Sequence, residues 1–113
     1  DVFGSSYLDK NINLPFEMPE AKHVYNQFVI KVLADRDQLS YQLKDIGIGT
    51  EIYYPLSLHL QECFEYLNIS ETAMPESKSA SMQTLALPIY PELPKESIEY
   101  IVENIGNIIF NKL

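Results

Sequence analysis

Cysteine and basic residues are scarce in this chain. Cys63 is the only cysteine among 113 residues, which excludes an internal disulfide and a cysteine-rich metal centre. Eight lysines and arginines stand against sixteen aspartates and glutamates, so the formal net charge is −8. That charge repels phosphate backbones and anionic membrane surfaces, and no basic cluster offsets it locally. We therefore expect neither nucleic acid nor membrane as a partner.

Long apolar runs are absent as well. No stretch approaches the ~18 apolar residues that a membrane-spanning helix needs, and no charged segment followed by an apolar one indicates a signal peptide. A lone cysteine fits a reducing compartment, so we expect a cytoplasmic protein. The chain begins with Asp1 and not with methionine, which suggests a fragment, a processed chain or a deliberately trimmed piece of a protein. Its 46% hydrophobic and 21% charged residues are typical of a globular domain.

Three segments have the composition of β-strands. Residues 24–33 are rich in β-branched and aromatic side chains, and Phe28 begins an alternation that places every second apolar side chain on one face. Residues 50–54 form a second, shorter run, which a proline ends because proline cannot donate to a sheet ladder. Residues 85–94 are a third extended segment, interrupted by further prolines.

A helix is predicted between the first two strands. Asp35 is an N-cap residue in sequence terms, because its side chain can accept a hydrogen bond from the first turn. Leu39, Leu43 and Ile46 follow at the spacing of one apolar stripe. Gly47 comes directly after them, where a left-handed residue commonly ends a helix.

Three more helices are predicted further along. Residues 58–67 have a short apolar stripe, with Cys63 beside it as an inert buried thiol. Residues 75–84 begin with a proline and carry a ridge of small side chains that lets another backbone approach closely. That ridge consists of Ser77, Ala80, Ser81 and Thr84. The last helix starts at Pro94 and repeats isoleucine and valine with helical period.

The order of these elements predicts the fold class. Three short strands cannot build a sheet covered by helices on both faces, so we expect an α+β fold. It consists of a small, mostly antiparallel three-stranded sheet with helices packed on one face. Residues 1–22, which contain turn formers and prolines, are expected to be an irregular lead-in, and residues 23–113 the domain.

Candidate chemistry within the chain is sparse. The sequence "GIGT" at 47–50 lacks the third glycine of a dinucleotide fingerprint and follows a helix, so it is interpreted as a helix cap and turn. His23 and His59 have no metal-ligand spacing, and we expect no metal site. A nucleophilic pair of Cys63 and His59 is conceivable at one helical turn, but no orienting acid is evident. Tyr53, Tyr54 and Tyr90 stand at strand ends, where tyrosines suit pocket rims and interfaces.

Three phrases of the sequence together resemble one known family. They are "AKHVYNQFVIKV", "LKDIGIGTEIYYPLSLHLQECFEYL" and "SASMQTLALPIYPELPKESIEYIVENI", in that order. They resemble the C-terminal small domain of the DegT/DnrJ/StrS sugar aminotransferases, which are pyridoxal-phosphate (PLP) enzymes of the aspartate-aminotransferase fold. The resemblance covers residues from about 14 to 110. It implies a parent chain several times longer, whose large domain carries the cofactor lysine and most phosphate ligands.

The resemblance also implies roles for particular residues. No catalytic residue is expected in this chain, and no PLP is expected to bind to it alone. Tyr53, Tyr54 and His59 would form a wall of the substrate cleft. His23, Tyr25 and Asn26 match a family motif that leads into the first strand and would serve the cleft or the packing. Many relatives have "YPxPxH" where this chain has "YPLSLH", so Ser57 departs from the family pattern.

The implied parent enzyme transfers an amino group, usually from glutamate, to a keto group of a nucleotide-linked sugar. Its partners would be the large PLP-binding domain, a second copy in a homodimer, and the sugar nucleotide. The setting would be amino-sugar, cell-surface polysaccharide or secondary-metabolite biosynthesis. Two alternatives remain at this point, a stand-alone small-ligand regulatory module and a dimerisation module that uses the last helix. The regulatory module in its ferredoxin-like form needs a β-α-β-β-α-β order.

Overall fold

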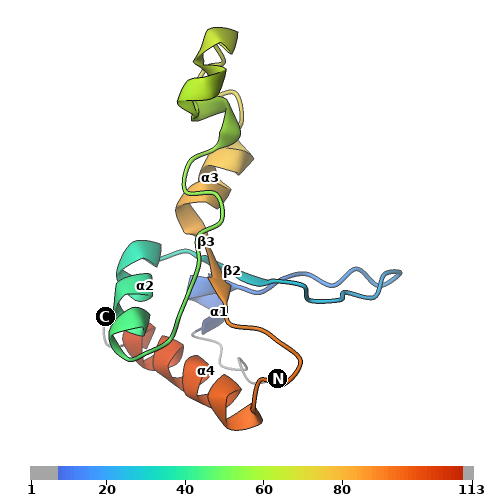
Figure 1. The fold of residues 1–113 in the computed structure, drawn as a ribbon, viewed down its shortest axis with the longest axis vertical. Coiled ribbons are helices and arrows are strands. Elements are labelled where there is room, and N and C mark those ends of the chain that lie inside the picture. Colours follow the sequence, from blue (N-terminus) through green and yellow to red (C-terminus); the bar gives the residue numbers. More distant parts are fainter. Residues whose placement is uncertain (1–7, 111–113) are drawn as a thin grey trace.

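The computed structural model describes residues 8–110 of the chain. Its elements are α1 (Leu8–Asn11), β1 (Ile12–Asn13), β2 (Phe28–Val32), α2 (Arg36–Asp45), the 3₁₀ turns η1 (Leu58–Leu60) and η2 (Glu62–Leu67), α3 (Pro75–Gln83), β3 (Thr84–Leu87) and α4 (Lys95–Phe110). Figure 1 shows β2 and β3 at the centre, with α2 and α4 on one side and α3 extending away from the sheet. Within residues 8–110, no helix is long and apolar enough to cross a bilayer.

The three strands form one antiparallel sheet in the order β1-β2-β3. Ile30 of β2 lies opposite Leu85 of β3, and Val32 lies opposite Ile12 of β1. All four side chains are buried, as the alternation of apolar residues along residues 24–33 predicts for one face of a strand. The expected α+β class with a small antiparallel sheet is thereby confirmed.

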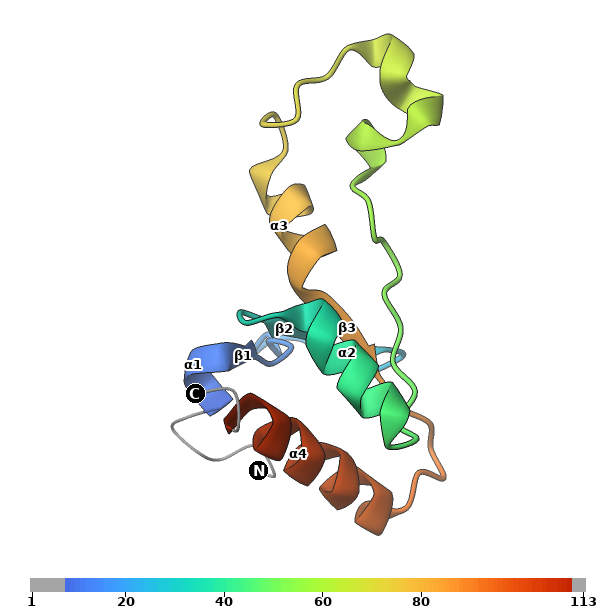
Figure 2. The same ribbon diagram turned by 90° about the vertical axis from the view of Figure 1, so that its left-hand side faces the viewer.

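Helices α2 and α4 cover that apolar face (Figure 2). The core joins side chains from all three strands and both helices, and its members are Ile12, Ile30, Val32, Leu39, Leu43, Ile48, Leu85, Leu87, Ile101, Ile105 and Ile109. Helix α4 contributes three isoleucines from one stripe, which follows its predicted period. This single apolar layer fixes the sheet, while the opposite sheet face is left without a helical layer.

Both ends of α2 follow the predicted capping chemistry. The Asp35 carboxylate accepts a hydrogen bond from the backbone N–H of Gln38 at 2.9 Å. Gly47 has φ +84°, and the next residue, Ile48, donates its N–H to the carbonyl of Leu43 at 2.9 Å. Such bonds satisfy the carbonyls at a helix end, and the left-handed geometry is one that glycine adopts readily.

Three predicted segments differ from the structure. Residues 50–54 form no strand; only Glu51 pairs, through an isolated bridge to Ala86, because the chain turns away at the following residues. Residues 8–13 belong to the predicted irregular lead-in, but they form α1 and the edge strand β1. Residues 1–7 of that lead-in lie outside the described residues. Residues 58–67 form two 3₁₀ turns and no continuous helix, because Gln61 is extended at φ −74° and ψ 141°.

Two segments project from the core layer. The connection between β1 and β2 extends as a narrow arm, and residues 55–79 extend in another direction with η1, η2 and the start of α3 (Figure 1). The radius of gyration is 15.8 Å, against about 13 Å for a compact domain of this length. Several large apolar side chains on the two projections are exposed, including Phe16, Met18, Val24, Leu56 and Leu58.

Candidate functional site

The uncovered sheet face is the floor of the candidate site. Val29 of β2 lies opposite Ala86 of β3 on this face, and neither side chain belongs to the core cluster. Glu51 runs beside β3 and is held there by two backbone hydrogen bonds to Ala86, of 2.8 and 3.1 Å. The chain continues from Glu51 into Tyr53 and Tyr54, so the bridge sets where these tyrosines begin.

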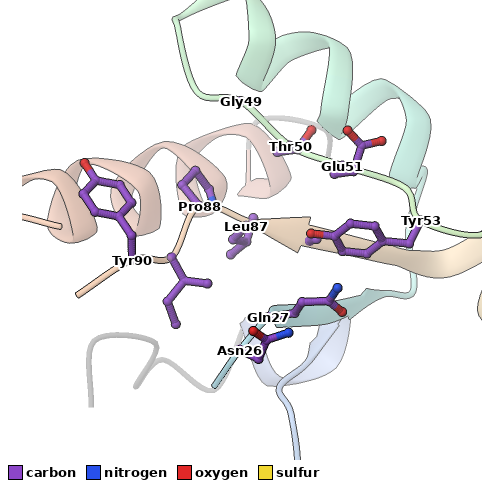
Figure 3. A pocket seen from close by; sticks show the side chains of 11 residues that line it. Asn26, Gln27, Gly49, Thr50, Glu51, Tyr53, Leu87, Pro88 and Tyr90 are labelled. Carbon is purple, nitrogen blue, oxygen red and sulfur yellow. The ribbon is translucent and has the colours of Figure 1, made fainter. Parts of the chain in front are cut away.

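A first hollow of ≈ 490 Å³ opens at one end of this face. Figure 3 shows Tyr53 and Tyr90 at opposite ends of it, with the amide side chains of Asn26 and Gln27 along one side. The remaining lining residues are Gly49, Thr50, Glu51, Ala86, Leu87, Pro88 and Ile89. Two phenol groups and two amides offer hydrogen-bond donors and acceptors, and the rings offer flat apolar surface.

A second hollow of ≈ 380 Å³ adjoins the first and shares Gln27, Glu51, Tyr53 and Ala86 with it. Tyr54, Ser57 and Leu58 form one of its sides. The opposite side is the small-residue ridge of α3, with Ser77, Ala80, Ser81 and Thr84. The ridge therefore lies beside residues 53–58, the tyrosine segment, as its small side chains permit. The two hollows form one continuous depression, with Tyr53 at their junction.

The tyrosines named from the sequence line this depression. Tyr53 is 49% exposed and belongs to both hollows, while Tyr54 is 65% exposed and belongs to the second. Tyr90, which was grouped with them as a strand-end tyrosine, lines the first hollow. Such exposed rings next to a depression are available for contact with a ligand or with another part of a larger protein.

His59 lies away from the two hollows and lines neither of them. It stands in η1, and its Nε2 atom is buried without a hydrogen-bond partner among the described residues. The nucleophilic pair of His59 and Cys63 needs both residues on one continuous helix. They lie in separate 3₁₀ turns, η1 and η2, so that arrangement is not present. Cys63 is also exposed, which corrects the expectation of a buried thiol; 3₁₀ geometry turns it to the surface.

His23, Tyr25 and Asn26 are placed by the arm between β1 and β2. The rings of His23 and Tyr25 stack with centroids 4.1 Å apart, and the Tyr25 N–H donates to His23 Nδ1 at 2.9 Å. Tyr25 has φ +48°, an uncommon left-handed conformation that this hydrogen bond holds. The Tyr25 hydroxyl donates to Glu17 at 3.2 Å. Desolvation, together with the negative charge and hydrogen bond of Glu17, raises the pKa of Tyr25.

These three residues divide between packing and the depression. Tyr25 lines none of the hollows described above, and its ring also stacks on Phe28 at 5.8 Å. Asn26 lines the first hollow. His23 and Asn26 both line a third hollow on the arm, which shares Gln27 and Val29 with the second. The sequence motif therefore supplies the arm with its internal stacking at Tyr25 and the depression with a polar side chain at Asn26.

Sequence reasoning missed Gln27, Glu51 and Ser57 as lining residues. Gln27 shares the strand face of Val29 by period two, so the alternation along β2 carried a signal for it. Glu51 and Ser57 had no such signal, because their positions depend on the bridge to β3 and on the contact with α3.

The depression lacks the groups that retain a phosphate. Glu51 is the sole charged residue that lines the first two hollows, and no lysine or arginine of the described residues does so. PLP carries a phosphate and needs cationic or N–H partners for it, together with a lysine for its aldehyde. The first two hollows therefore do not fit that cofactor by themselves. Residues 8–110 also contain no cluster of three or more potential metal ligands.

Comparison with known proteins shows which family has this fold. The model of the DegT/DnrJ/EryC1/StrS aminotransferase family matches residues 6–106. The chain belongs to this family, which confirms the resemblance carried by the three sequence phrases. The match includes the sheet, α2, α3 and most of α4.

Individual relatives agree with the family. The chain is 43% identical over 92 residues to a pleiotropic regulatory protein of Geobacillus stearothermophilus, covering 81% of this chain and 24% of that protein. It is 34% identical to a UDP-N-acetyl-3-dehydro-α-D-glucosamine 3-aminotransferase of Acidithiobacillus ferrooxidans, covering 84% and 26%. The solved structure of DesV from S. venezuelae matches with a TM-score of 0.81 at 26% identity, covering 95% and 30%. This chain thus spans about a quarter of the length of its relatives.

Proposed function

We propose that this chain is the small domain of a PLP-dependent aminotransferase that transfers an amino group to a keto group of a nucleotide-linked sugar. The observation that carries the proposal is the family match over residues 6–106, joined to relatives whose names describe sugar aminotransferases. The amino donor proposed is glutamate. The product would enter amino-sugar, polysaccharide or secondary-metabolite biosynthesis in the cytoplasm.

Within that enzyme, the depression would form one wall of the substrate cleft. Tyr53 and Tyr54 would supply ring surface and hydroxyl groups toward the sugar nucleotide, and Asn26 would add an amide on the same wall. His59, although predicted with the tyrosines, would support this wall from η1. His23 and Tyr25 would stiffen the arm by stacking. PLP, when bound, withdraws electrons from the reacting carbon, and its binding groups would come from the rest of the parent protein.

The partner of the uncovered face would be the large PLP-binding domain. Residues 23–113 would make up most of the small domain, with β1 borrowed from the preceding lead-in. The exposed apolar side chains of the two projections, which an isolated small protein seldom displays, are consistent with a covered position in a homodimeric parent. A stand-alone regulatory module is less well supported, because the observed element order differs from the β-α-β-β-α-β order of the ferredoxin-like form.

The proposal is tested by measuring PLP retention and amino transfer in the full-length protein that contains this chain. We expect purified protein to retain PLP through gel filtration and to show its absorption band beyond the ultraviolet absorption of tyrosine. With glutamate and a UDP- or dTDP-linked 3-keto sugar, it should form 2-oxoglutarate and an amino sugar, identified by mass spectrometry. The 113-residue chain alone serves as the control and should retain no PLP. Full-length protein that holds PLP but transfers no amino group to either sugar would contradict the proposed substrate class.

A further inference from the structure

Ser57 is the one buried residue in the stretch from Tyr53 to Leu58. It is 3% exposed, whereas both tyrosines, Leu56 and Leu58 are exposed. A segment with so little apolar burial gains little from packing, so its position depends on the few contacts that it makes. Ser57 is therefore the natural attachment point of the tyrosine segment.

The attachment is a hydrogen bond between two serines. Ser57 Oγ donates to Ser81 Oγ of α3 at 3.4 Å, and Ser81 Oγ donates in turn to the carbonyl of Lys78 at 2.8 Å. Each hydroxyl proton thus has one acceptor. The Ser57–Ser81 distance is longer than the roughly 2.5–3.0 Å that is usual between hydroxyl groups. Both serines are buried, however, and burial strengthens a hydrogen bond by shielding it from water. Twenty-four residues separate the two serines along the chain.

Both ends of the segment are held by rigid elements. The Arg36 guanidinium, itself buried at the start of α2, donates from Nη1 to the carbonyls of Ser81 and Thr84 at 3.1 and 2.9 Å. This fixes the end of α3 that carries Ser81. At the other end, the backbone pair of Glu51 and Ala86 attaches the segment to β3. Between Glu51 and Ser57, the chain borders the second hollow with Tyr53 and Tyr54.

We infer that the Ser57–Ser81 hydrogen bond is a positioning contact that sets the place of Tyr53 and Tyr54 over the depression. The inference rests on the proposed function, because it assigns these tyrosines to the sugar-nucleotide wall. Loss of the bond frees the Ser57 end of the tyrosine segment. It thereby changes the width of the second hollow, which lies between this segment and α3.

The experiment compares Ser57→Ala, Ser81→Ala, the double variant and Ser57→Thr in the full-length protein. Amide hydrogen exchange of residues 53–58 reports the contact independently of any activity. We expect each alanine variant to speed this exchange roughly two- to tenfold, the effect of one neutral hydrogen bond. The double variant should exchange no faster than the faster single variant, since both remove the same bond. Ser57→Thr should restore the slow exchange.

Steady-state kinetics with the UDP- or dTDP-linked keto sugar give the second readout. We expect the alanine variants to raise KM for the sugar nucleotide by a similar factor, with kcat changed less than twofold. The half-reaction with glutamate should be unaffected. Ser79→Ala is the matched control, because the Ser79 hydroxyl bonds to Gln83 within α3 and not to the tyrosine segment.

Each result has a distinct meaning. Unchanged exchange in Ser57→Ala, or independent additive effects of the two alanines, overturns the positioning contact. Faster exchange without a rise in KM overturns its role toward the substrate and leaves only a structural bond. An active enzyme is required for that second conclusion, so a full-length protein without transaminase activity overturns the proposed function instead, and the exchange data still decide the contact.

Discussion

Replacing Arg36 by methionine tests what joins the start of α2 to the end of α3. Arg36 is 7% exposed at the first position of α2, and its Nη1 atom donates to two carbonyls around the end of α3. Carbonyls in the last turn of a helix have no donor within the helix, so this guanidinium supplies one. Methionine keeps much of the apolar stem and removes both donors.

The expected loss of stability follows from these two bonds. A hydrogen bond from a charged donor contributes roughly 1.5–3 kcal/mol, and two that share one nitrogen do not add fully. Methionine also avoids the cost of burying a charge, which offsets part of the loss. We expect the free energy of unfolding to fall by roughly 2–3 kcal/mol. Arg36 also pairs through Nε with Asp37 at 2.6 Å, but Asp37 is 64% exposed, so that ion pair contributes below about 1 kcal/mol.

Urea unfolding of the 113-residue chain, followed by circular dichroism, measures this difference. Asp37→Asn is the matched control: it removes the ion pair and leaves both bonds to the carbonyls in place. We expect a small change for Asp37→Asn and a large one for Arg36→Met. The reasoning is refuted if the two variants lose equal stability, or if Arg36→Met unfolds at the urea concentration of the unmodified chain.

Three further outcomes are expected. Gly47→Ala should lower the free energy of unfolding by about 1 kcal/mol, because Gly47 has a left-handed φ and Gly49 does not. Gly49→Ala is therefore the control. Urea unfolding compares the two variants, and equal losses of stability would contradict the argument. Ile105→Ala should cost about 3 kcal/mol as a cavity at a fully buried site, and a loss below 1 kcal/mol would place Ile105 outside the core. The Lys78 hydrogen bond and charge lower the pKa of Glu71 below its ordinary 4.5. This stabilising contribution is complete above that pH and is lost as the pH falls through the folded value. An NMR titration of Glu71 should show its pKa rising in Lys78→Met, and an unchanged pKa would exclude the pairing.

The elements that the sequence predicts correctly are those specified by neighbouring residues. The caps of α2 at Asp35 and Gly47 depend on side chains and φ angles within a few positions. The long isoleucine period of α4 likewise needs no distant contact to be recognised. Both were predictable because local propensity and tertiary packing favour the same structure.

The errors occur where distant contacts decide. The composition of residues 50–54 is that of a strand, yet only Glu51 pairs with β3, through Ala86, because the chain turns away at the following residues. The two-residue β1 has too short a pattern to be recognised, and its pairing with β2 defines it. Residues 58–67 have a helical stripe but few neighbours to bury it, so the chain adopts 3₁₀ turns there.

The same distinction applies to the candidate site. Tyr53 and Tyr54 were identifiable as strand-end aromatics, and the structure places both at the depression. Ser57 was visible only as a departure from a family pattern; its burial against Ser81 depends on a contact with α3. His59 looked equivalent to the tyrosines in sequence, but it lies in η1 and lines neither of the two hollows.

The charge of the depression explains why this wall is insufficient for the proposed reaction. A sugar nucleotide and PLP each bring phosphate groups, which proteins hold with arginine, lysine or clustered backbone N–H groups. The first two hollows offer phenols, amides and one acidic residue, Glu51, so they suit the uncharged hydroxyl and ring surfaces of a sugar or base. In the proposed enzyme, the opposite wall would then supply the positive charge. In the parent enzyme, this division would let the small domain influence which sugar is accepted while the rest of the protein holds the anionic groups.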